Sequence, residues 1–196
     1  MATDVSICSN ALLMLGDVAI SSLTPANPAD ATDAVTLCAN IYPQVREWVL
    51  RKHSWNCAVA RVILAPDATP PAFDYAFQFS IPDDWLRTIQ VGQKDQGVDY
   101  QQEGRKFLCD ESVFYLVYVF NNKVESTFDS LLVEVLTAYM KAALAYPITK
   151  SSAMRDSCLL ELNQVLKLAR SIDGMDNPPD TLGDFRLFSA GFMSSF

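Results

Sequence analysis

The sequence predicts an α+β fold: a mainly α-helical bundle of about four helices, an antiparallel β insertion in the middle and an extended C-terminal tail. Apolar residues recur at three- and four-residue steps near both ends of the chain, which is the helical period. Short apolar runs separated by Pro, Gly and Asp turns fill the middle, which is typical of strands. The chain therefore divides into N-terminal helices (1–58), a β region (59–125), C-terminal helices (126–175) and a tail or arm (176–196).

The first helix is expected over residues 4–15, with Asp4 as its N-cap and Gly16 at its C-terminal cap. Six apolar side chains share one face of this segment: Val5, Ile7, Cys8, Ala11, Leu12 and Leu15. A second, longer helix is expected from Asn27-Pro28, an N-cap followed by a first-turn proline, to about Lys52. Pro43 removes one backbone hydrogen bond inside it, which predicts a kink near Ala39.

The β region is expected to contain six short strands. Turns at Pro70-Pro71, Pro82-Asp83-Asp84, Asp95-Gln96-Gly97 and Asp110-Glu111 separate them. We expect one face of the resulting antiparallel sheet to pack against the helices. The predicted strands are 59–65, 75–81, 86–92, 98–101, 106–109 and 113–120.

Helical periodicity returns at Phe128 and is expected to stop at Pro147. Ser151 or Ser152 then caps a fourth helix that runs to Gly174, with its inward face formed by Met154, Cys158, Leu159, Leu162, Val165, Leu166 and Ala169. The third helix presents Leu131, Leu132, Val135, Leu136, Tyr139, Met140, Ala143 and Leu144 to the core.

Composition and charge disfavour several classes of protein. The formal net charge is -8, and no basic cluster exceeds two residues, so ordinary nucleic-acid binding has little electrostatic support. Five scattered cysteines without a CxxC motif are expected to be reduced and buried, in a product made in the cytoplasm. We expect neither a signal peptide nor a membrane-spanning segment, because the longest apolar run identified, residues 113–120, is too short to cross a bilayer.

The single histidine, His53, offers one opportunity for a histidine-based catalytic triad. A structural role is favoured: His53 lies in the last turn of the long helix, where it can bond the terminal carbonyls. Trp55 is then the core anchor of the corner between helix and strand. The adjacent carboxylates Asp83 and Asp84 are assigned to a turn rather than to catalysis, and no metal or cofactor motif is found.

Four phenylalanines in the tail, Phe185, Phe188, Phe192 and Phe196, follow the helix-breaking Asn177-Pro178-Pro179. Burying each of them is worth roughly 1.5 to 3 kcal/mol, so exposure to water is unfavourable. Two alternatives stay open. The tail folds back on its own domain, or it is an arm that docks on a neighbouring subunit or another partner.

Several stretches resemble the tail tubular protein A family, the head-to-tail adaptors of short-tailed phages of the T-seven type. Residues 7–16 (ICSNALLMLG) are similar to the family's opening helix, and the likeness continues through 29–39, 42–46, 53–58 (HSWNCA), 79–87 (FSIPDDWLR) and 128–146. The order and spacing of these pieces carry the resemblance, which covers residues 4–175.

The resemblance implies a structural virion protein of the tail, not an enzyme, assembled as a dodecameric ring. Its partners would be the portal protein, the tail nozzle (a protein like tail tubular protein B) and tail fibres. DNA would pass through the lumen without sequence-specific binding, which the acidic balance suits. Two alternatives from other classes are a virion-associated peptidoglycan-degrading enzyme and a generic helical interaction module.

Overall fold

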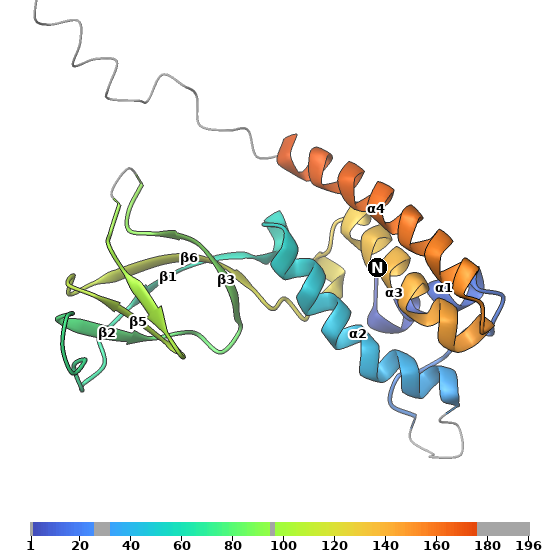
Figure 1. Cartoon of the computed structure of the whole chain (residues 1–196), viewed down its shortest axis with the longest axis horizontal. Helices are drawn as coiled ribbons and strands as arrows, with labels where there is room; N and C mark the ends of the chain where they lie inside the picture. Colours follow the sequence, from blue (N-terminus) through green and yellow to red (C-terminus); the bar gives the residue numbers. More distant parts are fainter. Residues whose placement is uncertain (1, 26–31, 95–96, 176–196) are drawn as a thin grey trace, which may run out of the picture.

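The computed structural model describes residues 2–25, 32–94 and 97–175, which form a helical lobe and a β lobe side by side (Figure 1). The α+β class predicted from the sequence is confirmed. The helical lobe contains α1 (Asp4–Met14), α2 (Asp33–Lys52), α3 (Ser130–Thr149) and α4 (Ser152–Met175). The short 3-10 helices η2 (Asn56–Ala58) and η3 (Glu125–Thr127) lie where the chain enters and leaves the β lobe.

Helix α3 is the centre of the helical lobe, because α1, α2 and α4 all pack on it (Figure 1). The predicted apolar stripes meet there and form one core. Its members include Ile7 and Leu12 of α1, Tyr42, Val45, Val49 and Leu50 of α2, Leu132, Val135, Leu136, Met140 and Leu144 of α3, and Leu166 and Ala169 of α4. Burial of these apolar surfaces is the main stabilising term of the lobe.

The start of α1 differs from the prediction, because Thr3 rather than Asp4 is the N-cap. The Thr3 hydroxyl accepts a hydrogen bond from the Ser6 N–H, and the Ser6 hydroxyl accepts one from the Thr3 N–H. This reciprocal pair satisfies two backbone donors, so Asp4 becomes the first helical residue. Gly16, with a φ of 82°, lies directly after the C-cap Leu15, as predicted.

Helix α2 begins at Asp33, and the Thr32 hydroxyl accepts a hydrogen bond from the Val35 N–H as its cap. The predicted start at Asn27-Pro28 lies outside the described residues. Pro43 lies inside the helix, as the sequence predicted. The buried side of α2 carries the predicted apolar residues and one charged side chain, Arg46.

The predicted stop of α3 at Pro147 is wrong by two residues, because the helix continues to Thr149 and ends with Lys150 in the left-handed conformation. A proline so close to the end removes only one backbone donor and has a φ that suits a helix. Ser151 caps α4 by accepting a hydrogen bond from the Met154 N–H. Met154 and Leu159, predicted to face inward, are exposed, because α4 rests on α3 along one side only.

The β lobe consists of two three-stranded antiparallel sheets with the orders β1-β6-β3 and β2-β5-β4. The strands are β1 (Val59–Leu64), β2 (Phe77–Ser80), β3 (Trp85–Val91), β4 (Gln101–Glu103), β5 (Lys106–Cys109) and β6 (Phe114–Phe120). The predicted strand at 98–101 is displaced: Val98 packs beside the lobe core, and the ladder begins at Gln101. Gly104, with a φ of 56°, lies in the turn between β4 and β5, where the left-handed region favours glycine.

The expectation that the β region packs one sheet face against the helices is wrong. Its buried aromatic side chains pack on one another, and Phe107 stacks on Phe114 with ring centroids 4.9 Å apart while Phe79 lies 5.1 Å from Phe114. The lobe therefore has a core of its own. The main contacts with the helical lobe lie at its base, where β3 and β6 meet α2 and Val119 of β6 joins the helical core.

Helix α3 is also the one helix in the described part of the chain that is long and apolar enough to cross a membrane. This segment was not predicted from the sequence, because charged and polar residues interrupt its apolar run and residues 113–120 form a longer uninterrupted one. Half of the apolar window is buried within the molecule, between α1, α2 and α4. That position is the one expected of the central helix of a bundle.

Candidate functional site

His53 is the C-cap of α2, one residue beyond the last helical turn to which the sequence assigned it. Its backbone is extended, so its ring turns away from the helix end and Nε2 lies 2.8 Å from Oδ2 of Asp173 in α4. The other oxygen, Oδ1, accepts a longer hydrogen bond of 3.5 Å from the Asn56 N–H. His53 therefore bonds Asp173 in place of the terminal carbonyls of its own helix, and this contact links the ends of α2 and α4.

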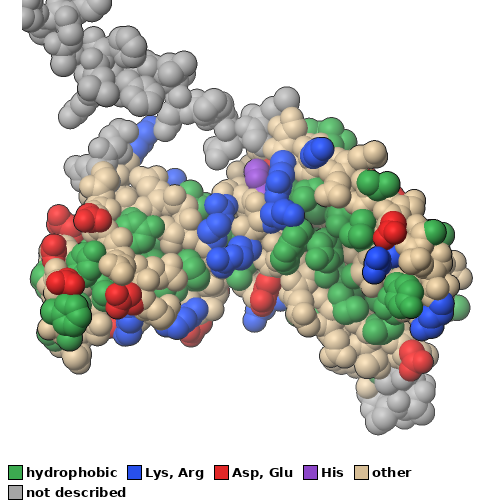
Figure 2. All heavy atoms as spheres, in the orientation of Figure 1, with side chains coloured by type: hydrophobic (Ala, Val, Ile, Leu, Met, Phe, Trp, Pro, Cys, Tyr) green, Lys and Arg blue, Asp and Glu red, His purple; other side chains and the backbone are tan. Residues whose placement is uncertain are grey.

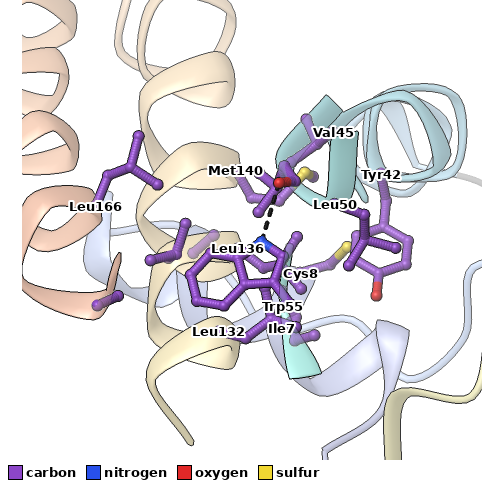
Figure 3. Close-up of a cluster of buried hydrophobic side chains, with 14 of the residues drawn as sticks. Ile7, Cys8, Tyr42, Val45, Leu50, Trp55, Leu132, Leu136, Met140 and Leu166 are labelled. Atoms are coloured by element: carbon purple, nitrogen blue, oxygen red, sulfur yellow. Dashed lines mark hydrogen bonds between the residues drawn. The ribbon is translucent and has the colours of Figure 1, made fainter. Parts of the chain in front are cut away.

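Trp55 occupies the helix-to-strand corner that the sequence proposed for it. Its side chain is 1% exposed, and the indole N–H donates a hydrogen bond of 3.0 Å to the Val49 carbonyl, near the end of α2 (Figure 3). Figure 3 shows the ring surrounded by residues of α1, α2 and α3. The His53 ring stands edge-on to it at 4.9 Å. Trp55 therefore fixes the direction in which the chain leaves α2.

The pairing of His53 with Asp173 supplies the orienting acid that the sequence did not reveal, because the two residues are 120 positions apart. A catalytic triad also needs a nucleophile in contact with the ring. The neighbouring Ser54 hydroxyl instead accepts a hydrogen bond of 2.7 Å from Arg87. Burial raises the pKa of the nearby Cys57 thiol, with a smaller contribution from the Asp173 charge, which disfavours the reactive thiolate.

A polar cluster that was not predicted from the sequence joins the two lobes. Buried Asn122 donates hydrogen bonds to the Cys57 carbonyl (2.8 Å) and the Thr127 hydroxyl (2.9 Å) and accepts one from the Val124 N–H (2.9 Å). Only the position of this asparagine directly after a long apolar strand hinted at such a role.

Glu125 forms a second part of this junction. It lies 3.3 Å from the Arg46 guanidinium and accepts a hydrogen bond of 3.1 Å from the Tyr42 hydroxyl. Burial, and then the Glu125 charge, raise the pKa of Tyr42, so this phenol stays protonated as a donor. Arg46 lies in α2, before the β insertion, and Glu125 lies in η3, after it, so their pairing ties the segment that leaves the insertion to α2.

The neighbouring carboxylates Asp83 and Asp84 lie in the turn before β3, as predicted. Asp84 accepts a hydrogen bond of 3.1 Å from the Tyr118 hydroxyl, and burial, followed by the Asp84 charge, raises the pKa of that tyrosine to about 12. The exposed Asp83 pairs with Arg105 at 3.3 Å. The two acids thus have separate structural partners in the turn.

All five cysteines are free, as predicted, but only four are buried, because Cys57 is partly exposed. Cys8 and Cys38, distant in sequence, meet between α1 and α2, where their hydrogen bond and burial raise the pKa of the Cys8 thiol. The described residues contain no group of three or more His, Cys, Asp or Glu side chains with the geometry of a metal site.

Hydrophobic side chains gather on the surface of the helical lobe between α2 and α4 (Figure 2). We name this surface the α3 face and define it by Trp48, Tyr139, Tyr146 and Leu159. Trp48 (41% exposed) stacks obliquely on Tyr139 of α3 with ring centroids 4.8 Å apart, and the Lys52 ammonium lies 3.9 Å from the Trp48 ring. Tyr146 and Leu159 are 52% and 42% exposed.

The α3 face was not predicted from the sequence, although one signal was present. Trp48 lies off the apolar stripe of its helix, so its ring was free to point outward. Leu159 was assigned to the core instead. The tail residues Phe185, Phe188, Phe192 and Phe196 lie outside the described part of the chain.

A second exposed apolar patch lies at the end of α1 and in the loop after it. It consists of Leu13, Met14 and Val18, which are 55%, 60% and 76% exposed. This patch shares no residue with the α3 face. The helical lobe therefore carries two different apolar surfaces.

No protein-family model matches the chain, and a search of curated proteins also gives no match.

Proposed function

We propose that this protein is a structural adaptor subunit of a phage tail, which assembles into a ring between the portal and the tail nozzle. The observation that carries the proposal is the pair of different apolar patches on one lobe. Exposed apolar patches mark interaction sites, and a subunit with two unlike patches can contact different elements of its two neighbours. Such unlike contacts give head-to-tail assembly, which closes into a ring when the rotation allows.

Three further features support a tail adaptor among ring-forming proteins. A helical bundle interrupted by a β-rich portion agrees with the tail tubular protein A family, which residues 4–175 resemble. The net charge of -8 suits a channel wall that repels DNA phosphates and lets the polymer slide. The hydrogen bonds of Asn122 and Glu125 at the junction hold helices and strands in place, which suits a structural subunit.

Co-sedimentation with portal rings tests the adaptor role. The chain is mixed with purified portal protein of the same phage and spun under conditions that leave free subunits in the supernatant. An adaptor should sediment with the portal at a fixed stoichiometry that reflects one added ring. A chain that stays in the supernatant at every ratio would contradict the proposal.

One observation favours a second function, a peptidoglycan-degrading enzyme: the 2.8 Å contact between His53 and Asp173 provides a base and its orienting acid. The adaptor account predicts that the purified protein releases no soluble fragments from peptidoglycan. Release that His53→Ala abolishes, with the fold unchanged by circular dichroism, would establish the enzyme. Release that instead depends on Asp83 or Glu103 would place the catalytic acid in the β lobe.

A further inference from the structure

The α3 face has the composition of a docking site rather than of an ordinary helix surface. Its aromatic and aliphatic side chains come from three helices that share this surface, since Trp48 contacts Tyr139 and Tyr146 lies two turns further along α3. Leu159 belongs to the same side of α4 as Arg170 and Asp173, which bond Lys52 and His53 of the α2 end. All these groups therefore border one continuous surface.

One end of the α3 face is positively charged. The Lys52 ammonium covers the Trp48 ring, and the Arg170 guanidinium donates a hydrogen bond of 3.1 Å to the Lys52 carbonyl. Arg170 Nε has no hydrogen-bond partner among the described residues. A partner that fits this surface should be apolar along most of its length and acidic at one end.

The last part of this chain has that composition. Between residues 176 and 196 it carries three aspartates (Asp176, Asp180 and Asp184), then the four phenylalanines, with Arg186 as its one basic residue. Fully extended, this stretch reaches about 70 Å, so it can span from one subunit to the next. The aspartates match the positively charged end of the α3 face, and the phenylalanines that follow them match its apolar part.

We propose that residues 185–196 of one copy dock on the α3 face of a neighbouring copy, with the phenylalanines against Trp48, Tyr146 and Leu159. The preceding aspartates then face Lys52 and Arg170. A neighbour is chosen over the same copy because Leu159 lies about 20 Å back along α4 from the point where the chain leaves it. To reach it on the same copy, residues 176–184 would have to double back along α4, and Asn177-Pro178-Pro179 disfavours this because it prefers extended backbone.

This inference rests on the self-assembly in the proposed function, and a mixing experiment with full-length variants tests it. The tail variant replaces all four phenylalanines by serine, and the face variant is Leu159→Glu. Each alone should associate about tenfold more weakly than the intact chain. Their mixture should form a one-to-one complex and no larger species, because the tail of the face variant binds the intact face of the tail variant.

The matched control is Leu168→Glu. Leu168 is also an exposed leucine of α4 (57%), but it lies on the opposite flank of the helix from Leu159. This variant should associate like the intact chain. A mixture of tail and face variants that stays monomeric would overturn the docking site, because the vacant face of the tail variant and the free tail of the face variant would then fail to bind. An intact chain that associates no more strongly than either single variant would overturn docking on a neighbour and indicate docking on the same copy.

A peptide assay separates this inference from the proposed function. A fluorescent peptide of residues 176–196 should bind the full-length tail variant. An unlabelled peptide should blue-shift its tryptophan emission, since Trp48 is 41% exposed. The double variant that combines the tail substitutions with Leu159→Glu should bind the peptide about tenfold more weakly. Absence of binding would overturn the docking site. Peptide binding and a mixed one-to-one complex, without ring formation by the intact chain, would overturn the proposed function and leave the docking site standing.

Discussion

At the scale of single residues, the neighbouring side chains of the corner at residues 53–58 have different structural roles. Trp55 carries the packing, because its ring fills the space between three helices and its N–H satisfies a carbonyl at the end of α2. His53 contacts Asp173. The His53 side chain is 24% exposed and the Asp173 side chain is 11% exposed. A single hydrogen bond contributes about 1 kcal/mol, less than a buried aromatic ring, so the tryptophan should dominate the stability of the corner.

Trp55→Ala should therefore lower the free energy of unfolding by about 3 to 5 kcal/mol, since it leaves a large cavity and an unpaired carbonyl. His53→Ala should lower it by about 1 kcal/mol or less. Chemical denaturation of both variants provides the measurement. An equal loss for the two substitutions would show that the His53–Asp173 tie, and not the buried ring, holds the corner.

The residues of this region differ in how well the sequence predicts their surroundings. The burial of Trp55 could be predicted because an aromatic residue between a helical and a strand pattern belongs to the core. Asp173 could not be predicted as the partner of His53, because no local pattern connects residues so far apart. Leu159 was misassigned since periodicity gives the apolar side of a helix but not which part of that side a neighbour covers.

At the scale of elements, the helices were largely predictable and their ends only in part. A stripe of apolar residues defines α3 over many turns, whereas its end depends on one proline and one left-handed lysine. The β lobe illustrates a second limit. Its strands follow from alternation and turns, but the sequence does not reveal whether a sheet packs on helices or on another sheet.

The junction between the lobes depends on the buried side chain of Asn122. Asn122→Ala should cost about 1 to 3 kcal/mol, because the Cys57 carbonyl and the Val124 N–H lose their partner in a buried place. Asn163→Ala serves as the control, since its amide bonds the Leu159 carbonyl on an exposed surface. Thermal unfolding of the two variants checks the prediction, and equal melting temperatures would refute a special role for Asn122.

At the scale of the whole molecule, two lobes with separate cores are joined by two crossings of the chain, and the helical lobe carries two unlike apolar patches. One patch ends α1, and the other is the α3 face. Under the proposed function, two unlike surfaces let the subunits assemble in one direction, and the acidic balance lets DNA pass without attachment. The difference between the two apolar patches is the basis of the proposed function.

Negative-stain imaging of the purified chain, alone and mixed with portal rings, tests the central claim most directly. The account predicts closed rings of one size with twelve-fold symmetry, formed by the chain itself or as an added layer at one end of the portal. Monomers or small oligomers in both samples, with the portal unchanged, would contradict it.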